Sequence, residues 1–587
     1  MHYDHASYAV QGYILAMGEL RGIIAVTAVI VAGTMAMRAQ DMDRSLMEAA
    51  GVSDVEELDE ETVEGFSHYR ISPIRINGAS RGTMISSGLF SPYEAASVLD
   101  YRSRYGDILS VSELSLVDGF GAKRARALAP FLSFASKSAP GALPDTLRSR
   151  CSFATRAGVS RGKGMSYSLK CRYLLEERLS AAVSCRSGFG DRLFPPSGYS
   201  FHFCLYGRKA LESLIVGDYN ARFGEGLLAW SGSFMTALSG SDSFSRRPSG
   251  LTPSWSWSSA EVHRGVAATF RLGQRVTVSA FGGFPGLRGV MEGRKGKVGV
   301  DGGVNASWYG SRHHLSLTAV GGTAGKEAMG LSGSFKWTPG RPVFFAEAAA
   351  RPVKGAFSFI AGSIIPFGEG WRTAVRVGAV PTAYSGKKNG NYSLAGCVEY
   401  STWKGLKSVL TGELGLLPVP GKDPRRKDLK IVWTSRFPIG ERYSLELRLR
   451  HRLAPGSDGN RTEARLDQDY SVSNWKARLR AHAVYGGGWG GFSYLEAGYD
   501  NSSLKVFARL SGCYTSSWQS RIYCYERDAP GNFSVMVFHG RGVAFFILAG
   551  YSRKWKGHSL GVWFRPYYEK TDSRTGAGVR LQFSLEI

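Results

Sequence analysis

Apolar and polar residues alternate one by one along much of the chain after residue 148. The stretches 165–173, 443–450, 475–483 and 579–587 place apolar residues at every second position, with polar or charged residues between them. Successive side chains of a β-strand point to opposite faces, so each stretch predicts a strand with one apolar and one polar face. Segments of this length with aromatic ends are typical of strands that cross a membrane in a closed barrel.

A soluble β-sandwich also alternates, but its apolar face packs inward and its charges face water. The export signal described below, the aromatic strand ends and a strand that runs to the last residue favour the barrel. We therefore predict a mainly β fold, a transmembrane antiparallel β-barrel over 148–587. At a typical length of strand plus loop, this region accommodates roughly 16–20 strands.

The pattern is different between residues 70 and 133, where it predicts a small all-α domain. Asn77 and Ser80 are start signals for a helix to about residue 86, and Pro92 suits the first turn of a helix over 92–104. Two further helices are expected near 111–116 and 122–129. Glycine-containing turns at 88–90 and 119–121 join these helices in pairs, which indicates a tandem helix-hairpin-helix domain.

The residues before this domain predict export. Arg21 precedes a short apolar run over 23–37, as in a secretory signal peptide, so residues 1–40 are assigned to a signal whose true start could be Met17. Residues 41–69 are strongly acidic with apolar residues at loosely helical spacing, which predicts a solvated helix or a flexible tether. The remaining stretch, 134–147, is expected to link the helical domain to the barrel.

Composition narrows the function class. The formal net charge of +25 suggests polyanionic neighbours such as nucleic acid, lipopolysaccharide phosphates or acidic polysaccharide. The seven cysteines have no metal-ligand spacing, although two of them could form a disulfide across a loop. The chain contains no nucleophile, zinc-protease or nucleotide-loop motif. We therefore expect no enzyme activity, no catalytic residues, no cofactor and no metal site.

The second hairpin carries the candidate nucleic-acid contacts. Glycines let the backbone turn tightly, and the amides of the following helix then face an anion at the positive end of the helix dipole. Such contacts hold a phosphate backbone regardless of base sequence. The first hairpin, with Phe90 and Pro92, is expected to be structural. The candidate phosphate-binding residues are Gly119, Phe120, Gly121, Ala122, Lys123, Arg124 and Arg126.

Two glycine-rich, charged segments, 216–230 and 525–542, have the composition of a constriction that faces the lumen of a barrel. They predict a salt-bridged cluster that either stabilises the barrel or lines a pathway. Its members are Asp218, Arg222, Glu225, Arg527 and Asp528. Basic residues on the polar strand faces would favour anions in the lumen, namely Lys170, Arg172, Arg448, Arg450, Lys476, Arg478 and Arg480.

The segments Ile76–Ser80, Leu99–Arg102, Tyr105–Gly106, Leu109–Leu114 and Val117–Gly121 resemble the DNA receptor of competence systems, the ComEA-like family. The resemblance covers about 60 residues and implies sequence-independent binding of double-stranded DNA. The whole chain looks like a group of exported proteins of Gram-negative bacteria in which this helical domain precedes an outer-membrane barrel. Val216–Trp230, Tyr525–Asp528, Phe533–Ser534 and Gly540–Gly542 are similar to recurring segments of that group.

Together these observations predict an outer-membrane β-barrel whose helix-hairpin-helix domain lies in the periplasm and binds double-stranded DNA, linked to uptake or transport. Two alternatives stay open. In one, the protein is structural, and the helical domain docks a periplasmic protein partner or plugs the barrel. In the other, the protein is a porin-like channel for anionic solutes. The expected surroundings are outer-membrane lipid, and the sequence does not set the oligomeric state.

Overall fold

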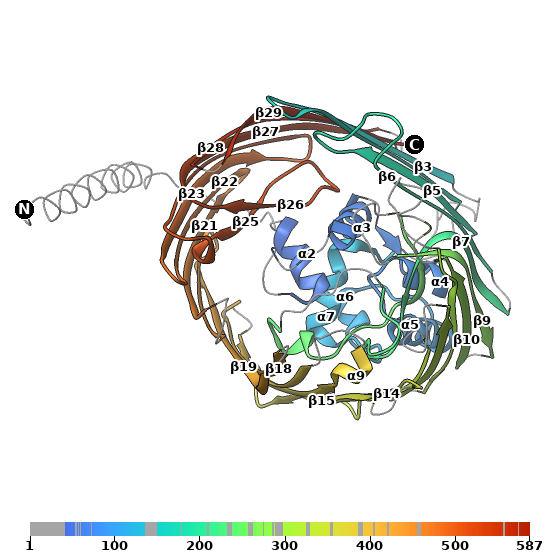
Figure 1. Ribbon diagram of the computed structural model, residues 1–587. Coiled ribbons are helices and arrows are strands. Elements are labelled where there is room, and N and C mark those ends of the chain that lie inside the picture. Colours follow the sequence, from blue (N-terminus) through green and yellow to red (C-terminus); the bar gives the residue numbers. More distant parts are fainter. Residues whose placement is uncertain are drawn as a thin grey trace, which may run out of the picture.

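The computed structural model forms a closed barrel with helices inside it (Figure 1). It describes residues 42–587 except for 53–55, 57, 59, 72, 136–148, 176–177, 208–209, 232–237, 256–261, 274, 285–286, 288–297, 311, 324–328, 353–355, 386–390, 403–404, 420–421, 455–458, 556–557 and 573. The predicted signal peptide (1–40) and most of the predicted linker (134–147) therefore lie outside the described residues.

The barrel wall confirms the predicted fold class. Every neighbouring pair of wall strands is antiparallel, and β29 (Arg574–Glu586) returns to pair with β3 (Ser149–Ser160), which closes the sheet. In the described part of the chain the wall has 24 strands, more than the 16–20 expected. The expected number was too low because the connections at one end of the barrel are shorter than assumed.

The first half of the wall runs through β4 (Gly164–Leu175), β5 (Leu179–Ser187), β6 (Gly198–Tyr206), β7 (Leu211–Arg222), β9 (His263–Leu272), β10 (Val276–Gly283), β11 (Asp301–Tyr309), β12 (His313–Gly322), β13 (Gly330–Trp337), β14 (Val343–Ala350), β15 (Phe357–Phe367) and β16 (Trp371–Val380). The second half comprises β17 (Asn391–Ser401), β18 (Lys407–Val419), β19 (Lys422–Ile439), β20 (Tyr443–Leu453), β21 (Arg461–Val472), β22 (Trp475–Tyr485), β23 (Trp489–Asp500), β24 (Leu504–Thr515), β27 (Arg541–Trp555) and β28 (His558–Thr571).

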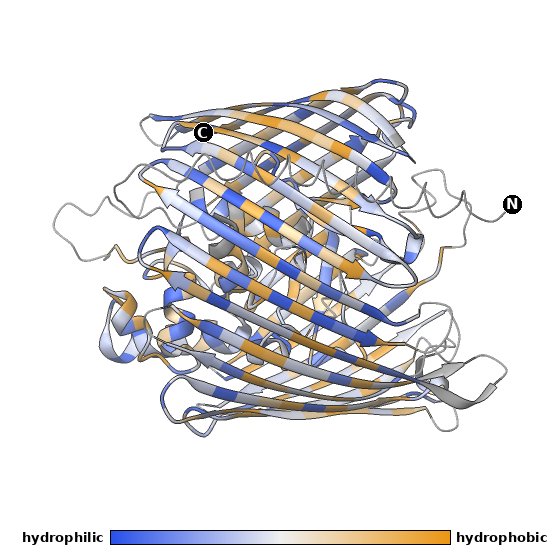
Figure 2. Cartoon of the chain, turned by 90° about the vertical axis from the view of Figure 1, so that its left-hand side faces the viewer, coloured by the Kyte–Doolittle hydropathy of each residue, from blue (hydrophilic) through white to orange (hydrophobic). Residues whose placement is uncertain are grey.

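The two faces of the wall differ as the alternation predicts. On β4, Met165 is 52% exposed on the outside, whereas Arg172 is 8% exposed on the inside. On β22, Trp475 is 64% exposed and Arg480 is 5% exposed. Figure 2 shows the same alternation as orange and blue segments along single strands. The outer surface is therefore apolar, as it must be where lipid replaces water.

The two rims of the barrel also differ. At the rim where β3 begins and β29 ends, the connections between consecutive strands are only 2–5 residues long. Aromatic side chains ring this rim, and Trp371 packs on Tyr400 while Trp475 packs on Tyr499. At the opposite rim the two longest connections span residues 223–262 and 516–540. Short turns at one end, long loops at the other and an aromatic girdle are the features of an outer-membrane barrel.

The described parts of both long loops fold into the lumen (Figure 1). The loop over 223–262 contains β8 (Gly250–Pro253), which extends the pairing of β7, and the 3-10 turn η4 (Ser241–Ser243). The loop over 516–540 contains η6 (Trp518–Ser520) and a hairpin of β25 (Ile522–Glu526) and β26 (Ser534–Phe538). A one-turn helix, α9 (Thr382–Ser385), lies in a shorter loop at the same rim.

The helical domain lies inside the barrel and not in the periplasm, which corrects the main expectation and agrees with the alternative of a plug (Figure 1). Its helices are α2 (Met42–Ala50), α3 (Glu60–Ile71), α4 (Arg81–Ser86), α5 (Pro92–Tyr105), α6 (Val111–Leu114) and α7 (Gly121–Leu128), followed by η3 (Ala129–Phe131), with β1 (Ile74–Arg75) pairing in parallel with β2 (Leu132–Ser133). Four of these helices, α4 to α7, begin and end close to the predicted positions, and two more precede them in the acidic segment. No helix in the described ranges is long and apolar enough to cross a membrane.

The acidic segment is part of this domain and not a solvated tether. Leu46 and Ala49 of α2 and Val63 and Phe66 of α3 are buried in one apolar cluster with the residues of α4–α7. The acidic residues occupy positions between these apolar anchors, so the high charge of the segment concealed its share of the core. Tyr525 and Phe533 of the inward-folded hairpin pack against the same cluster. We call residues 42–135 the plug.

The second hairpin turn of the plug offers a matched test of its glycines. Gly119 and Gly121 both have positive φ, +86° and +67°. A Cβ at Gly119 would lie 2.6 Å from the Tyr93 ring, whereas a Cβ at Gly121 would meet nothing within 4 Å. We expect Gly121→Ala to cost about 1–2 kcal/mol for its left-handed backbone and Gly119→Ala about 1–3 kcal/mol more. Hydrogen exchange of the α7 amides measures both, and equal losses would contradict the steric argument.

Candidate functional site in the barrel lumen

The second hairpin of the plug faces the barrel wall and one of the inward loops. Phe120 is buried at the start of α7, where its ring packs on Phe90. The Lys123 ammonium lies 2.8 Å from Asp242 in the η4 turn and 2.7 Å from Glu399 on β17. In the structure, Lys123, one of the three cations predicted to hold a phosphate, is therefore bound by two carboxylates of the same chain.

The other two cations of the predicted phosphate site have different surroundings. Arg124 points into the plug, where it bonds Glu94 at 2.8 Å and the Ala49 carbonyl at 2.7 Å, and also the Leu89 carbonyl. Arg126 is exposed and donates to the carbonyl of Ala122, one turn earlier. The three cations thus have three roles, and Arg124 is a structural residue of the plug.

Glu94, which the sequence places in a structural first hairpin, has two partners that explain its burial. It completes a capping box with Ser91 at the start of α5, and it accepts the Arg124 guanidinium. Burial alone would raise the pKa of Glu94, but Arg124 and Arg247 outweigh it and hold the pKa below its ordinary value. This ion pair connects the two hairpins through the centre of the plug.

A pH test follows from the contacts of Lys123. Burial alone would raise the pKa of Asp242, but Lys123 and Arg372 hold it well below 3.8. Burial would lower the pKa of Lys123, but Asp242 and Glu399 raise it above 10.5. A carboxyl group whose pKa is lowered by its partner stabilises the contact at pH values above its ordinary pKa. This stabilisation is lost as the pH falls through the lowered pKa.

We therefore expect the plug to stay seated from neutral pH down to about pH 4 and to loosen below it. Hydrogen exchange of α7 in the full chain, corrected for the intrinsic rate at each pH, measures this. Loosening already at pH 6 would show that a group other than these carboxylates holds the plug.

Two more ion-pair contacts seat the plug on other parts of the wall. Arg81 on α4 is 3% exposed, lies 3.6 Å from Glu212 on β7 and stacks over the Tyr309 ring. In the connection between α2 and α3, the Glu56 carboxylate lies 2.7 Å from Arg480 on β22. The plug therefore contacts the wall at three separate places, on β7, β17 and β22.

The predicted charge cluster does not form one group. Asp218 pairs with Arg264, Arg222 donates to the Ser231 carbonyl, and Glu225 accepts from Ser245 and the Arg246 amide. Arg527 pairs with Glu496, and Asp528 lies between Arg156 and Arg580. Both segments do face the lumen, but β7 and the β25–β26 hairpin stand at different parts of the wall (Figure 1).

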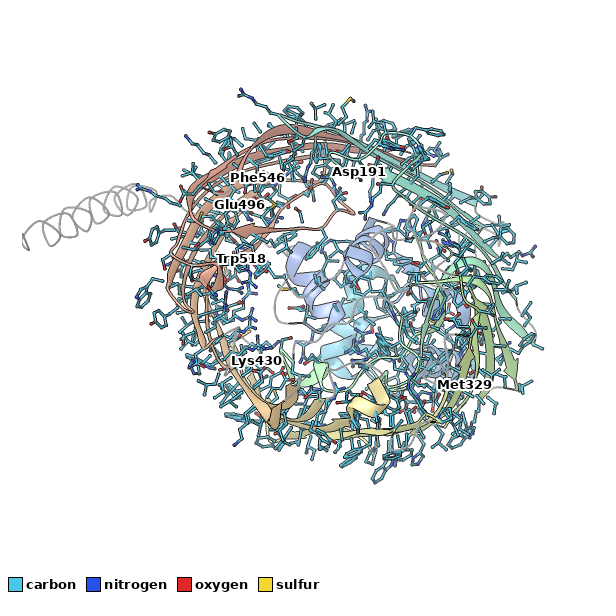
Figure 3. All side chains as sticks on the ribbon, in the orientation of Figure 1. Asp191, Met329, Lys430, Glu496, Trp518 and Phe546 are labelled. Carbon is cyan, nitrogen blue, oxygen red and sulfur yellow. The ribbon has the colours of Figure 1, made fainter. Side chains whose placement is uncertain are left out.

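The basic lumen residues predicted from the strands are largely balanced by carboxylates of neighbouring strands. Arg450 lies near Glu463, Lys476 pairs with Asp500, and Arg478 pairs with Asp469. Lys170 and Arg172 face the Trp255 ring. Figure 3 shows Glu496 on the inner side of the wall, where it binds Arg509 at 2.6 Å.

Sequence reasoning missed the carboxylates in the contacts that seat the plug, which are Glu56, Glu212, Asp242 and Glu399. Glu56 lies in the acidic segment, one acid among ten over 41–66, and nothing local distinguishes it. Asp242 and Glu399 lie far from the helical domain in sequence. Only the pairing of distant segments in the lumen reveals them.

No family model and no curated protein matches the sequence significantly. Among solved structures, the P pilus usher (PapC) translocation pore is 10% identical with a TM-score of 0.34, over 75% of this chain and 99% of that one. Pseudomonas aeruginosa OccK10 (OpdN) is 13% identical with a TM-score of 0.29, over 53% and 97%. The ferric citrate transporter FecA is 10% identical with a TM-score of 0.37, over 75% and 79%. At scores this low, the fold assignment rests on the strand pairing of the chain itself.

Proposed function

We propose that this protein is an outer-membrane transport barrel whose lumen is closed by its own N-terminal plug. The observation that carries the proposal is the seat of the plug inside the lumen. Lys123, Arg81 and Glu56 each contact an oppositely charged group of the barrel. Barrels with more than about 20 strands are wide enough to need such a plug if they are to stay closed.

The outer-membrane location is part of the proposal, and three features support it. The outward face of the wall is apolar, and the rim where β3 begins and β29 ends carries an aromatic girdle. The long loops lie at the opposite rim. In barrels of this class the short turns face the periplasm. The same orientation places the entry of the plug on the periplasmic side.

DNA binding by the helical domain stays a separate proposal. The turn at Gly119 and Gly121 has the positive φ angles that a phosphate-holding hairpin needs. However, a phosphate at this turn would have to displace Asp242 and Glu399 from Lys123. The seated plug therefore favours closure of the barrel as the role of this domain, and contact with double-stranded DNA would require an unseated plug.

A charge reversal and its compensation test the seat. Lys123→Glu places a third carboxylate beside Asp242 and Glu399, and like charges in a partly buried site repel. We expect this variant to open far more often than the wild type in planar bilayers. The second substitution Glu399→Lys restores one pair of opposite charges. The double variant should therefore stay closed for much more of the recording than Lys123→Glu alone.

Arg126→Glu, on the exposed side of the same helix, is the matched control and should behave like the wild type. A Lys123→Glu channel that stays as closed as the wild type would overturn the proposed seat.

A further inference from the structure

The Glu56 carboxylate is surrounded by donors of the wall and of the inward-folded hairpin. Its Oε1 lies 2.7 Å from Nη1 of Arg480 and accepts the backbone N–H of Tyr525 at 3.2 Å. Its Oε2 lies 3.5 Å from Nη1 of Arg465. Two guanidinium groups and a backbone amide around one carboxylate form an anion-binding arrangement.

Two of the three donors belong to the wall, and the Tyr525 amide belongs to the inward-folded hairpin. Arg465 and Arg480 are both buried. The Nε of Arg480 donates to Asp467 at 2.6 Å, and the Nε of Arg465 lies 2.9 Å from the same carboxylate. The Arg480 guanidinium also lies over the Tyr494 ring, 5.4 Å from its centre. Asp467 and Tyr494 therefore position the Arg480 guanidinium without help from Glu56.

Carboxylates of the wall also lie near these guanidinium groups. Asp467 lies 2.9 Å from Arg465, and Glu446 lies 3.4 Å from it. Glu56 adds a carboxylate of the plug, which lies 2.7 Å from Arg480. The plug therefore supplies one of the anions that these wall cations contact.

We propose that Arg465, Arg480 and the Tyr525 amide form a binding site for a carboxylate or phosphate group of the transported solute, and that Glu56 fills this site while the plug is seated. The inference rests on the proposed function, because it treats the plug as the closed state. A solute anion and Glu56 then compete for the same donors, so binding of the solute weakens the seat of the plug.

The test is a calorimetric titration of the full-length protein in detergent with citrate and, separately, with inorganic phosphate. In Glu56→Ala the donors lose their internal ligand, and we expect an apparent Kd at least about ten-fold lower than in the wild type for one of the two anions. Tighter binding of citrate would indicate that the site takes a carboxylate group, and tighter binding of phosphate would indicate that it takes a phosphate group.

Two variants serve as controls. Glu113→Ala removes a plug carboxylate that bonds only groups of the plug, Tyr101 and the Leu109 amide, and should bind like the wild type. Glu56→Ala combined with Arg480→Gln should lose the gain, provided the barrel still migrates as a folded species on unheated gels.

The inference is wrong if Glu56→Ala binds neither anion more tightly, or if the gain survives in the double variant. Both outcomes are measured as anion binding and do not depend on the conductance of the barrel. A failure of the plug to control conduction would therefore be seen separately from a failure of the anion site.

Discussion

Deletion of the plug, residues 42–135, is expected to convert the protein into a continuously conducting pore, with a conductance about ten-fold or more above that of the full chain. The described wall closes on itself without the plug, because β29 pairs directly with β3. The plug adds no strand to the wall. Barrels of 16–18 strands already enclose an aqueous channel, so a wall of 24 strands should leave a wider one.

Planar-bilayer recording of the purified proteins measures this prediction, and sensitivity of cells to a large antibiotic that porins exclude gives a second readout. The inward loops over 223–262 and 516–540 remain in the deletion variant and should limit the conductance below that of an empty cylinder. A variant in which only residues 136–147 are replaced by a Gly/Ser linker keeps the plug and is the control. Equal conductance of the deletion variant and this control would show that the plug does not close the lumen.

The wall was predictable from the sequence because its signal is local. Every second residue of a strand faces lipid, so Met165 and Arg172 on β4 identify their faces without knowledge of the neighbouring strands. Helices α4 and α5 of the plug were predictable for the same reason, since Ser80 and Pro92 act within one helical turn. The strand number was not, because it depends on turn lengths that alternation does not reveal.

The sequence offered a plug only as one alternative and could not decide for it, because the position of the plug depends on contacts between segments far apart in the sequence. Lys123 and Glu399 are 276 residues apart, and Glu56 and Arg480 are 424 residues apart. The net charge of +25 suggested external polyanions. In the structure much of the basic charge of the lumen instead faces carboxylates of the same chain, which a sum over the sequence cannot show.

Arg124 illustrates how a motif can assign the right residue type to the wrong role. A cation at the start of α7 fits a phosphate site, but the side chain turns inward to Glu94 and to two backbone carbonyls. Loss of DNA binding in an Arg124 variant would therefore not locate a DNA site, because the variant would first lose the structure of the plug. Lys123, whose contacts are with the barrel, is the better position for that test.

Arg124→Ala is expected to lower the free energy of unfolding of the plug by about 3–5 kcal/mol, because it leaves the buried Glu94 carboxylate without its partner and two carbonyls without their donor. Hydrogen exchange of α5 and α7 in the full chain measures the loss. Arg126→Ala, two residues away and exposed, should change the free energy by less than about 0.5 kcal/mol.

Glu94→Gln combined with Arg124→Ala should recover part of the loss, since a neutral side chain is less costly to bury than an unpaired carboxylate. The acid side gives an independent check. The pKa of Glu94 is lowered in the folded plug, so the wild-type advantage over Arg124→Ala should shrink as the pH falls below the ordinary carboxyl value. A loss as small as that of Arg126→Ala would mean that Arg124 does not hold the two hairpins together and that its cation is free for another ligand.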